Sequence, residues 1–279
     1  MKIFLFPFLL DLVGFLVTMR VADAAGREMH LSNLLAAMLV VAFSAGYMLA
    51  CLPAGYILTR RNSRAILIAS VVSLMVLSVP IFYSNRFMPV AVLMFAFGVS
   101  LAFAFNSFQT YMRGEAGVGS LGRTISRYTF SWSSGIGFGF LFGGLFKSGG
   151  GATALSTASI IFCLAILALA ITHSQNDHEN DSADGQMETI TTLHPDDEAA
   201  NSRELALHWR YVIIGWSICF GCNFGMRPIS TFIPKFLAEQ GHPAWLAGGM
   251  LFSLYVMQAL IGSQAYKFRG WQYRKTPLL

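Results

Sequence analysis

Long apolar runs alternate with short polar segments along the chain. Eight of these runs come close to the roughly 20 residues that an α-helix needs to cross a lipid bilayer. A backbone surrounded by lipid must satisfy its own hydrogen bonds, so runs of this length favour helices. We therefore predict an all-α, polytopic integral membrane protein. Its expected membrane-spanning helices cover residues 3–19, 34–58, 65–83, 88–111, 128–146, 152–172, 211–234 and 244–266.

A long polar segment interrupts this alternation after the sixth run. Residues 173–208 carry nine acidic side chains against Arg203 alone, and they contain almost nothing apolar to bury. We expect a flexible acidic linker on the cytoplasmic side. The predicted domains are thus a six-helix amino-terminal bundle over 1–172, the linker over 173–208, and a partial second bundle with a basic tail over 209–279.

The first apolar run has two interpretations. Lys2, the apolar stretch and the segment Ala22-Asp23-Ala24 also resemble a secretory signal peptide with its cleavage site. We favour a retained helix, because the motifs described below fall into place when this helix is counted. Cleavage would leave the orientation of the remaining helices unchanged.

Composition and charge narrow the class of protein further. The chain is 55% apolar and 12% charged, which is unlike a water-soluble domain of this length. The net charge of +5 comes from short basic clusters between apolar runs, so we exclude nucleic-acid binding. Four cysteines form no recognisable disulfide framework.

The positions of the basic residues predict the orientation, since Lys and Arg near helix ends stay on the cytoplasmic side. A cytoplasmic amino terminus assigns thirteen basic residues to cytoplasmic segments and five to outer ones, and we expect the inner (plasma) membrane. The thirteen are Lys2, Arg60, Arg61, Arg64, Arg113, Arg123, Arg127, Arg203, Arg210, Lys267, Arg269, Arg274 and Lys275; the five are Arg20, Arg27, Arg86, Lys147 and Lys235.

The hairpin between the second and third runs carries a spaced motif. Gly55, Arg60 and Arg64 match the spacing Gly-x-x-x-[acid]-Arg-x-Gly-x-[Arg/Lys], while Thr59 takes the acidic position and Asn62 the second glycine position. This resembles the loop between helices 2 and 3 of the major facilitator superfamily, whose members are twelve-helix secondary transporters. The resemblance implies a role in closing the cytoplasmic gate. Thr59 stands where the family has aspartate, so Arg60 would need a different partner.

A glycine motif lies on the fifth run, at Gly135, Gly139, Gly143 and Gly144. Residues four apart share a helix face, so these glycines form a groove that another helix can approach closely. They also resemble the glycine-rich helix 5 motif of exporters in the same superfamily, except that Phe140 replaces a proline. We expect helix packing, with a weak indication of export.

The order of these motifs along the chain matches the superfamily. The resemblance implies secondary active transport of a small solute by alternating access, with no enzymatic reaction and no cofactor. It covers about two-thirds of a complete transporter, so we expect truncation after the eighth helix. The alternative is a non-transporting membrane protein, or one that needs a partner chain; a homo-oligomer formed through the glycine faces is one such case.

Two ionisable residues are predicted to lie within the bilayer. A charged side chain is costly there, so its presence suggests a function. Asp11 lies in the middle of the first run and could carry a coupling proton or face a cationic solute; a packing role is the alternative. Arg227 precedes Pro228 in the seventh run and could bind an anion or pair with Asp11. The alternative for Arg227 is that it reaches towards the outer interface.

Uncharged polar residues complete the candidate solute site, since facilitator sites use such groups near the membrane midplane. Interhelical hydrogen bonds would explain them equally well. They are Asn106, Gln109, Trp132, Asn223 and Gln258. We expect no metal site, because Cys219 and Cys222 lie inside an apolar run without a second ligand pair. The expected partners are the lipid bilayer, the solute and a coupling proton.

Overall fold

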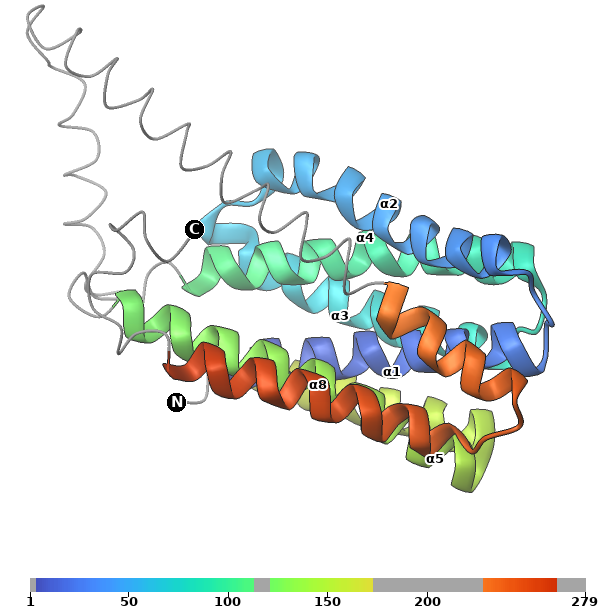
Figure 1. Cartoon of the computed structure of the whole chain (residues 1–279). Helices are drawn as coiled ribbons and strands as arrows, with labels where there is room; N and C mark the ends of the chain where they lie inside the picture. The colour runs from blue at the N-terminus through green and yellow to red at the C-terminus, as the bar shows by residue number, and fades with distance from the viewer. Residues whose placement is uncertain (1–3, 113–120, 173–227, 265–279) are drawn as a thin grey trace, which may run out of the picture. The chain divides into compact units, whose positions relative to one another are not determined.

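A computed structural model describes residues 4–112, 121–172 and 228–264 of the chain. All regular secondary structure in these ranges is helical, and six of the helices are long and apolar enough to cross a membrane. The labelled helices are α1 (Leu5–Arg27), α2 (Asn33–Ile57), α3 (Arg60–Tyr83), α4 (Phe87–Met112), α5 (Leu121–Thr172) and α8 (Ala244–Gln264), and a further helix covers residues 228–239. The predicted all-α membrane fold is confirmed (Figure 1).

The α5 element consists of two helices that meet at Gly151. This glycine has φ 61° and ψ −145°, a backbone conformation that interrupts a helix and that favours glycine. The part before Gly151 runs parallel to α1, because Gly135 lies against Phe8 and Gly139 against Leu12. The part after it runs in the opposite direction. The break coincides with the predicted gap between residues 146 and 152.

Some helix boundaries differ from the predicted ones. The first helix was predicted to end at residue 19, but α1 continues to Arg27, because its charged residues are buried against partners within the protein. The third was predicted to begin at residue 65, but α3 begins at Arg60. There Thr59 and Asn62 form a capping box that satisfies backbone N–H groups at the helix start.

The seventh predicted helix, over 211–234, lies mostly outside the described residues. Its described part is helical from residue 228 and continues past 234 to 239, where Gly241 with φ 79° follows in the turn. The predicted linker over 173–208 and the basic tail after residue 264 also lie outside the described residues. By contacts, the described residues before 173 and after 230 form one compact unit, the first of the two into which the chain divides.

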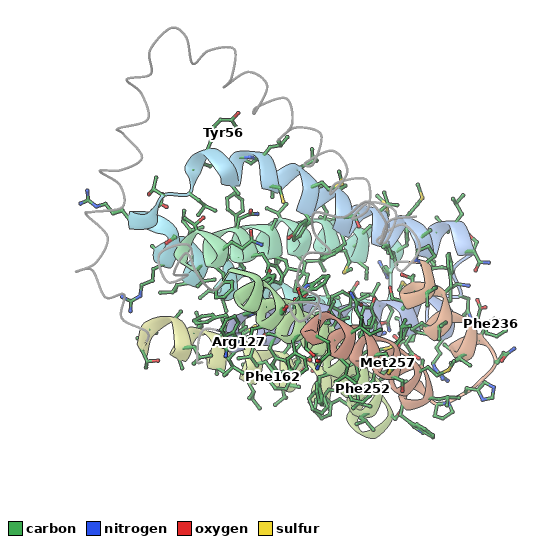
Figure 2. The ribbon with its side chains drawn as sticks, turned by 60° about the vertical axis from the view of Figure 1, so that its left-hand side comes forward. Tyr56, Arg127, Phe162, Phe236, Phe252 and Met257 are labelled. Atoms are coloured by element: carbon green, nitrogen blue, oxygen red, sulfur yellow. The ribbon has the colours of Figure 1, made fainter. Side chains whose placement is uncertain are left out.

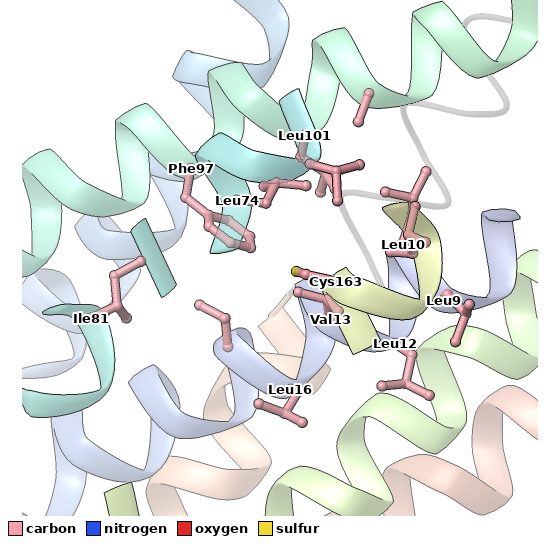
Figure 3. Packing of buried hydrophobic residues seen from close by; sticks show 14 of the residues in the cluster. Leu9, Leu10, Leu12, Val13, Leu16, Leu74, Ile81, Phe97, Leu101 and Cys163 are labelled. Carbon is pink, nitrogen blue, oxygen red and sulfur yellow. The ribbon is translucent and has the colours of Figure 1, made fainter. Parts of the chain in front are cut away.

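The first helix is the central element of the first unit. Of its membrane-spanning segment, 89% is buried, against 28% for α2. Leu10, Val13 and Leu16 of α1 face a cluster that includes Phe97 of α4 and Cys163, as Figure 3 shows. Polar residues on α1 therefore lie inside the protein and not against lipid.

The outward faces of α2 and α8 are apolar. The exposed side chains of α2 include Met48, Leu52 and Tyr56, and those of α8 include Met257 and Ile261. Figure 2 shows Tyr56 projecting away from the α2 ribbon. Exposed apolar surface of this extent is what a lipid bilayer covers, which agrees with a multi-pass membrane protein.

Candidate functional site

The carboxyl group of Asp11 is buried in α1, where the residue is 3% exposed and takes part in interactions within the protein. Because α1 extends from Leu5 to Arg27, its centre is at Leu16. Asp11 therefore lies about 7.5 Å along the axis from the centre, at a rise of 1.5 Å per residue. The predicted mid-helix position was wrong, since the charged residues after residue 19 belong to the same helix.

A tyrosine that was not singled out in the sequence lies beside the predicted polar residues. The Nε2 of Gln109 in α4 lies 3.5 Å from the hydroxyl oxygen of Tyr128 in α5. Asp11 is close enough to Tyr128 for the two side chains to interact electrostatically. Polar groups from α1, α4 and α5 thus gather in one region. The sequence signal for Tyr128 is its position one helical turn before Trp132.

Other predicted site residues have separate surroundings. Asn106 donates through Nδ2 to the carbonyl of Ala102 at 2.8 Å and lies 3.6 Å from the Cys51 sulfur of α2. Trp132 is half-buried and packs against the apolar core. The Oε1 of Gln258 in α8 is buried and accepts no hydrogen bond from the part of the chain that the structure describes. Asn223 and Arg227 lie outside the described residues, so the pairing of Arg227 with Asp11 stays a prediction.

The arginine hairpin is held by backbone capping. Asn62 Oδ1 accepts from the Thr59 N–H at 2.7 Å, and the Thr59 hydroxyl accepts from the Asn62 N–H at 3.4 Å. Thr59 is thus the N-cap of α3, a role that its hydroxyl oxygen fills where the family has an aspartate carboxylate. Gly55 is exposed, with open space around it. Arg60 is the first residue of α3.

Arg64 connects this hairpin to the end of the helix that follows Gly151. Its Nε donates to the Ala170 carbonyl at 3.0 Å and its Nη2 to the Ile171 carbonyl at 2.8 Å. The last carbonyls of a helix lack partners within the helix and carry partial negative charge, so a guanidinium stabilises them. Arg64 therefore caps that helix.

The glycines of α5 lie where other helices come closest. A Cβ on Gly135 would lie 2.3 Å from the Phe8 carbonyl oxygen, and one on Gly139 would lie 2.7 Å from that of Leu12, both in α1. Gly143 faces Met19 of α1. Gly144 faces α8, where a Cβ would lie 2.6 Å from the Ala244 carbonyl oxygen. No larger residue would fit at these distances without moving a helix.

A group of ion pairs lies at the opposite end of the bundle from Arg64. We call it the Glu28 network, and it consists of Arg20, Asp23, Arg27, Glu28 and Lys147. The two Glu28 oxygens accept from Arg20 Nη2 at 2.7 Å and from Lys147 Nζ at 2.5 Å. Asp23 accepts from Arg27 Nε at 2.8 Å, and its other oxygen lies 4.0 Å from Lys147 Nζ. The network connects the end of α1 to α5.

Arg20 also connects α1 to α3. Its Nη2 donates to the Phe82 carbonyl at 3.1 Å and to Asn85 Oδ1 at 3.3 Å, and its Nε donates to the same carbonyl at 3.3 Å. Arg20 is only 2% exposed. A buried charge is tolerated when it has several good partners, and the loss of one partner is then strongly destabilising.

The protonation of Glu28 reflects these contacts. Partial burial by itself raises the pKa of this carboxyl, but the hydrogen bond from Lys147 and the charge and hydrogen bond of Arg20 outweigh burial, so that the pKa of Glu28 is lowered from its ordinary value. Glu28 is therefore a carboxylate at neutral pH and holds both cations.

The Glu28 network was missed in the sequence, because the apolar run ends at residue 19 and Arg20 and Arg27 were assigned to an outer segment. Asp23 and Arg27 are opposite charges four residues apart, a spacing that stabilises helices. This signal could have extended the predicted helix. The long-range partners Phe82 and Lys147 carry no comparable sequence signal.

The helix over 228–239 contributes a buried cation next to this network. Lys235, which is 3% exposed, donates to Asn33 Oδ1 at 2.9 Å and forms a short contact with Glu239 Oε1. Arg27 Nη2 in turn makes a short contact with the carbonyl oxygen of His242. The start of α2 and the end of α1 are thus joined to the segment around residues 235–242.

A small pocket lies beside Lys235, between α1, α2, α4 and the 228–239 helix. Its walls are mostly apolar and contain two hydroxyl groups besides the ammonium group. The lining residues are Thr18, Val21, Ala22, Ala25, Ala36, Leu39, Val40, Met94, Thr231 and Lys235.

Comparison with known proteins identifies the family. No curated protein and no solved structure matches the chain. The family model described as Major Facilitator Superfamily matches residues 3–276, and the helical membrane fold agrees with it. Members of this family transport solutes across membranes. Because the match extends over nearly all 279 residues, the chain belongs to the Major Facilitator Superfamily.

Proposed function

We propose that this protein carries a small solute across the plasma membrane by alternating access, coupled to protons through Asp11. The observation that carries this proposal is the burial of the Asp11 carboxyl in α1, the most buried of the membrane-spanning helices. Family membership supports solute transport in general, and Asp11 supplies the group for coupling.

A carboxyl group in this position can bind and release a proton during transport. Burial disfavours the charged form, so protonation neutralises the group at low cost when the site is closed. Exposure to water on one side of the membrane would restore the charge and release the proton. Gln109 and Tyr128, which lie close to each other near Asp11, are the proposed hydrogen-bonding groups for the solute.

The proposed orientation has the amino terminus and the Arg64 end in the cytoplasm and the Glu28 network outside. The distribution of basic residues supports it. The glycines on α5 support export over import, through their resemblance to the exporter motif. Six-helix packing over 1–172 and a separate second bundle are the proposed domain organisation.

Proton coupling is tested with the full chain in proteoliposomes that enclose a pH-sensitive dye. Low-molecular-weight fractions of a cell extract are added, and internal pH and solute uptake are recorded together. The parent protein is expected to move protons with the solute. Asp11→Asn is expected to abolish proton movement, while Ser70→Ala is expected to retain it. Ser70→Ala is the control, because the Ser70 hydroxyl lies in α3 and donates only to the Ile66 carbonyl of its own helix among the contacts described.

Two results would contradict the proposal. Solute uptake without any pH change in the parent would exclude proton coupling. Proton movement that persists in Asp11→Asn would show that another group carries the proton.

A further inference from the structure

We propose that the end of the bundle at the Glu28 network is a gate that opens without separating any ion pair. Its closing contacts are the hydrogen bond from Lys235 to Asn33 and the contact of Arg27 with the His242 carbonyl. This inference rests on the proposed function, because alternating access requires two groups of helices to move apart at each end of the protein in turn.

The two groups of helices meet closely at this end. The first group consists of α1 to α5, and the second consists of the helix over 228–239 and α8. A Cβ on Gly26, near the end of α1, would lie 2.9 Å from the Lys235 carbonyl oxygen and 3.2 Å from the Ala238 Cβ. The groups therefore leave no space between them at this point.

The ion pairs at this end each lie within one group, among the residues that the structure describes. The Glu28 network pairs its charges inside the first group. Lys235 pairs with Glu239, one turn along the same helix, inside the second group. Each group thus keeps its own ion pairs when the two groups move apart.

Neutral oxygen atoms accept the polar contacts between the two groups. Lys235 Nζ donates to Asn33 Oδ1 at 2.9 Å, and Arg27 Nη2 contacts the His242 carbonyl oxygen. A hydrogen bond to water replaces one to a neutral acceptor at little net cost, whereas the loss of a buried ion pair is costly. Opening this end is therefore easier than it would be with an acidic residue at position 33.

The experiment measures how fast a buried cysteine behind the gate reacts with a maleimide, in the full chain in nanodiscs. Ala36→Cys is the reporter, because Ala36 is 2% exposed and lies one helical turn beyond Asn33 in α2. Mass spectrometry separates the reporter peptide from the four native cysteines. The reporter is expected to react slowly but completely, as the gate opens and closes.

Asn33→Asp is the decisive variant, because it turns the Lys235 contact into an ion pair between the two groups. It is expected to slow labelling about fivefold, which corresponds to a strong ion pair with one exposed partner. A misfolded variant would be labelled faster and cannot mimic this result. Lys235→Met is expected to speed labelling several-fold, and Asn33→Asp is expected to have little effect in the Lys235→Met protein.

Asn85→Asp is the matched control. Asn85 Oδ1 accepts from Arg20 Nη2 at 3.3 Å, and Arg20 is buried. The variant therefore makes the same chemical change beside a buried cation, but inside the first group. It is expected to leave the labelling rate of the reporter unchanged.

The proposal is overturned if Asn33→Asp is labelled as fast as the reporter protein, if Asn85→Asp slows labelling equally, or if the reporter is never labelled. Labelling requires neither a solute nor a proton gradient, so these outcomes are separate from the proton-coupling test. Slower labelling of Asn33→Asp, together with proton movement in Asp11→Asn, would retain the gate and reject coupling through Asp11. Unchanged labelling of Asn33→Asp, with proton movement lost in Asp11→Asn, would do the reverse.

Discussion

At the scale of single residues, Glu28 makes stability depend on pH in the acidic range. Its pKa is lowered in the folded protein, so its contribution is fully present above the unfolded pKa of about 4.3 and is lost as the pH falls through the folded pKa. Glu28→Gln lacks this titration. The Tm difference between the parent and Glu28→Gln is therefore expected to be large at about pH 7 and to shrink towards about pH 3.

Thermal unfolding of both proteins over this pH range measures the effect. Thr18→Val serves as the uncharged comparison, and its Tm difference from the parent is expected to vary much less with pH. The Tm difference between the parent and Glu28→Gln could instead be the same at both ends of this pH range. In that case, the contacts of Arg20 and Lys147 would stabilise the protein without the Glu28 charge.

Individual residues were predicted from the sequence where the signal is local. The motif that drew attention to Thr59 and Arg64 lies within one hairpin, between the second and third helices. By contrast, the partners of Arg64 are the carbonyls of Ala170 and Ile171, which are more than a hundred residues away in the chain. Such contacts depend on how helices pack, and one sequence carries no pattern for them.

At the scale of helices, glycines determine how closely α5 approaches α1. Gly135→Ala would place a methyl carbon 2.3 Å from the Phe8 carbonyl oxygen, so α1 and α5 must separate. The expected loss of stability is about 1–3 kcal/mol, typical of overpacking. Denaturant unfolding in detergent measures it.

Gly149→Ala is the matched control for this variant. It lies in the same α5 element with open space around it and is expected to change stability little. Alanine favours a helix more than glycine does, so helix propensity cannot cause a loss. Equal losses for both variants would therefore mean that the close approach of Gly135 to Phe8 does not determine the effect.

Helices were predicted well as apolar runs and less well at their ends. The α1 prediction stopped at the first charge because a lone charge in lipid is costly. That cost does not apply to Arg20 and Asp23, which are buried among protein partners. Helix ends in this protein depend on tertiary burial, which the apolar pattern does not contain.

At the scale of the whole molecule, the two ends of the bundle are predicted to face opposite sides of the membrane. Arg86 and Arg61 are exposed at opposite ends. A membrane-impermeant maleimide on intact cells is expected to label Arg86→Cys, and to label Arg61→Cys only after permeabilisation. Mass spectrometry of the peptides distinguishes these sites from the four native cysteines. The reverse labelling pattern would invert the proposed topology.

The superfamily was predictable from the order of its motifs, and the family match confirms it. The central position of α1 was not predictable, since its apolar run resembles those of helices that face lipid. Only the packed structure distinguishes them, and that distinction places Asp11 inside the protein.

The hydrogen-bond partners of Arg64 are backbone carbonyl groups, so protonation does not alter how the hairpin is attached. Carbonyl oxygens do not titrate, whereas an aspartate partner would lose its charge in acid. The contact between the hairpin and the helix end at Ala170 and Ile171 therefore persists whatever the local proton concentration. Acidification on the side of this hairpin would therefore leave both partner carbonyls, and the attachment that they form, unchanged.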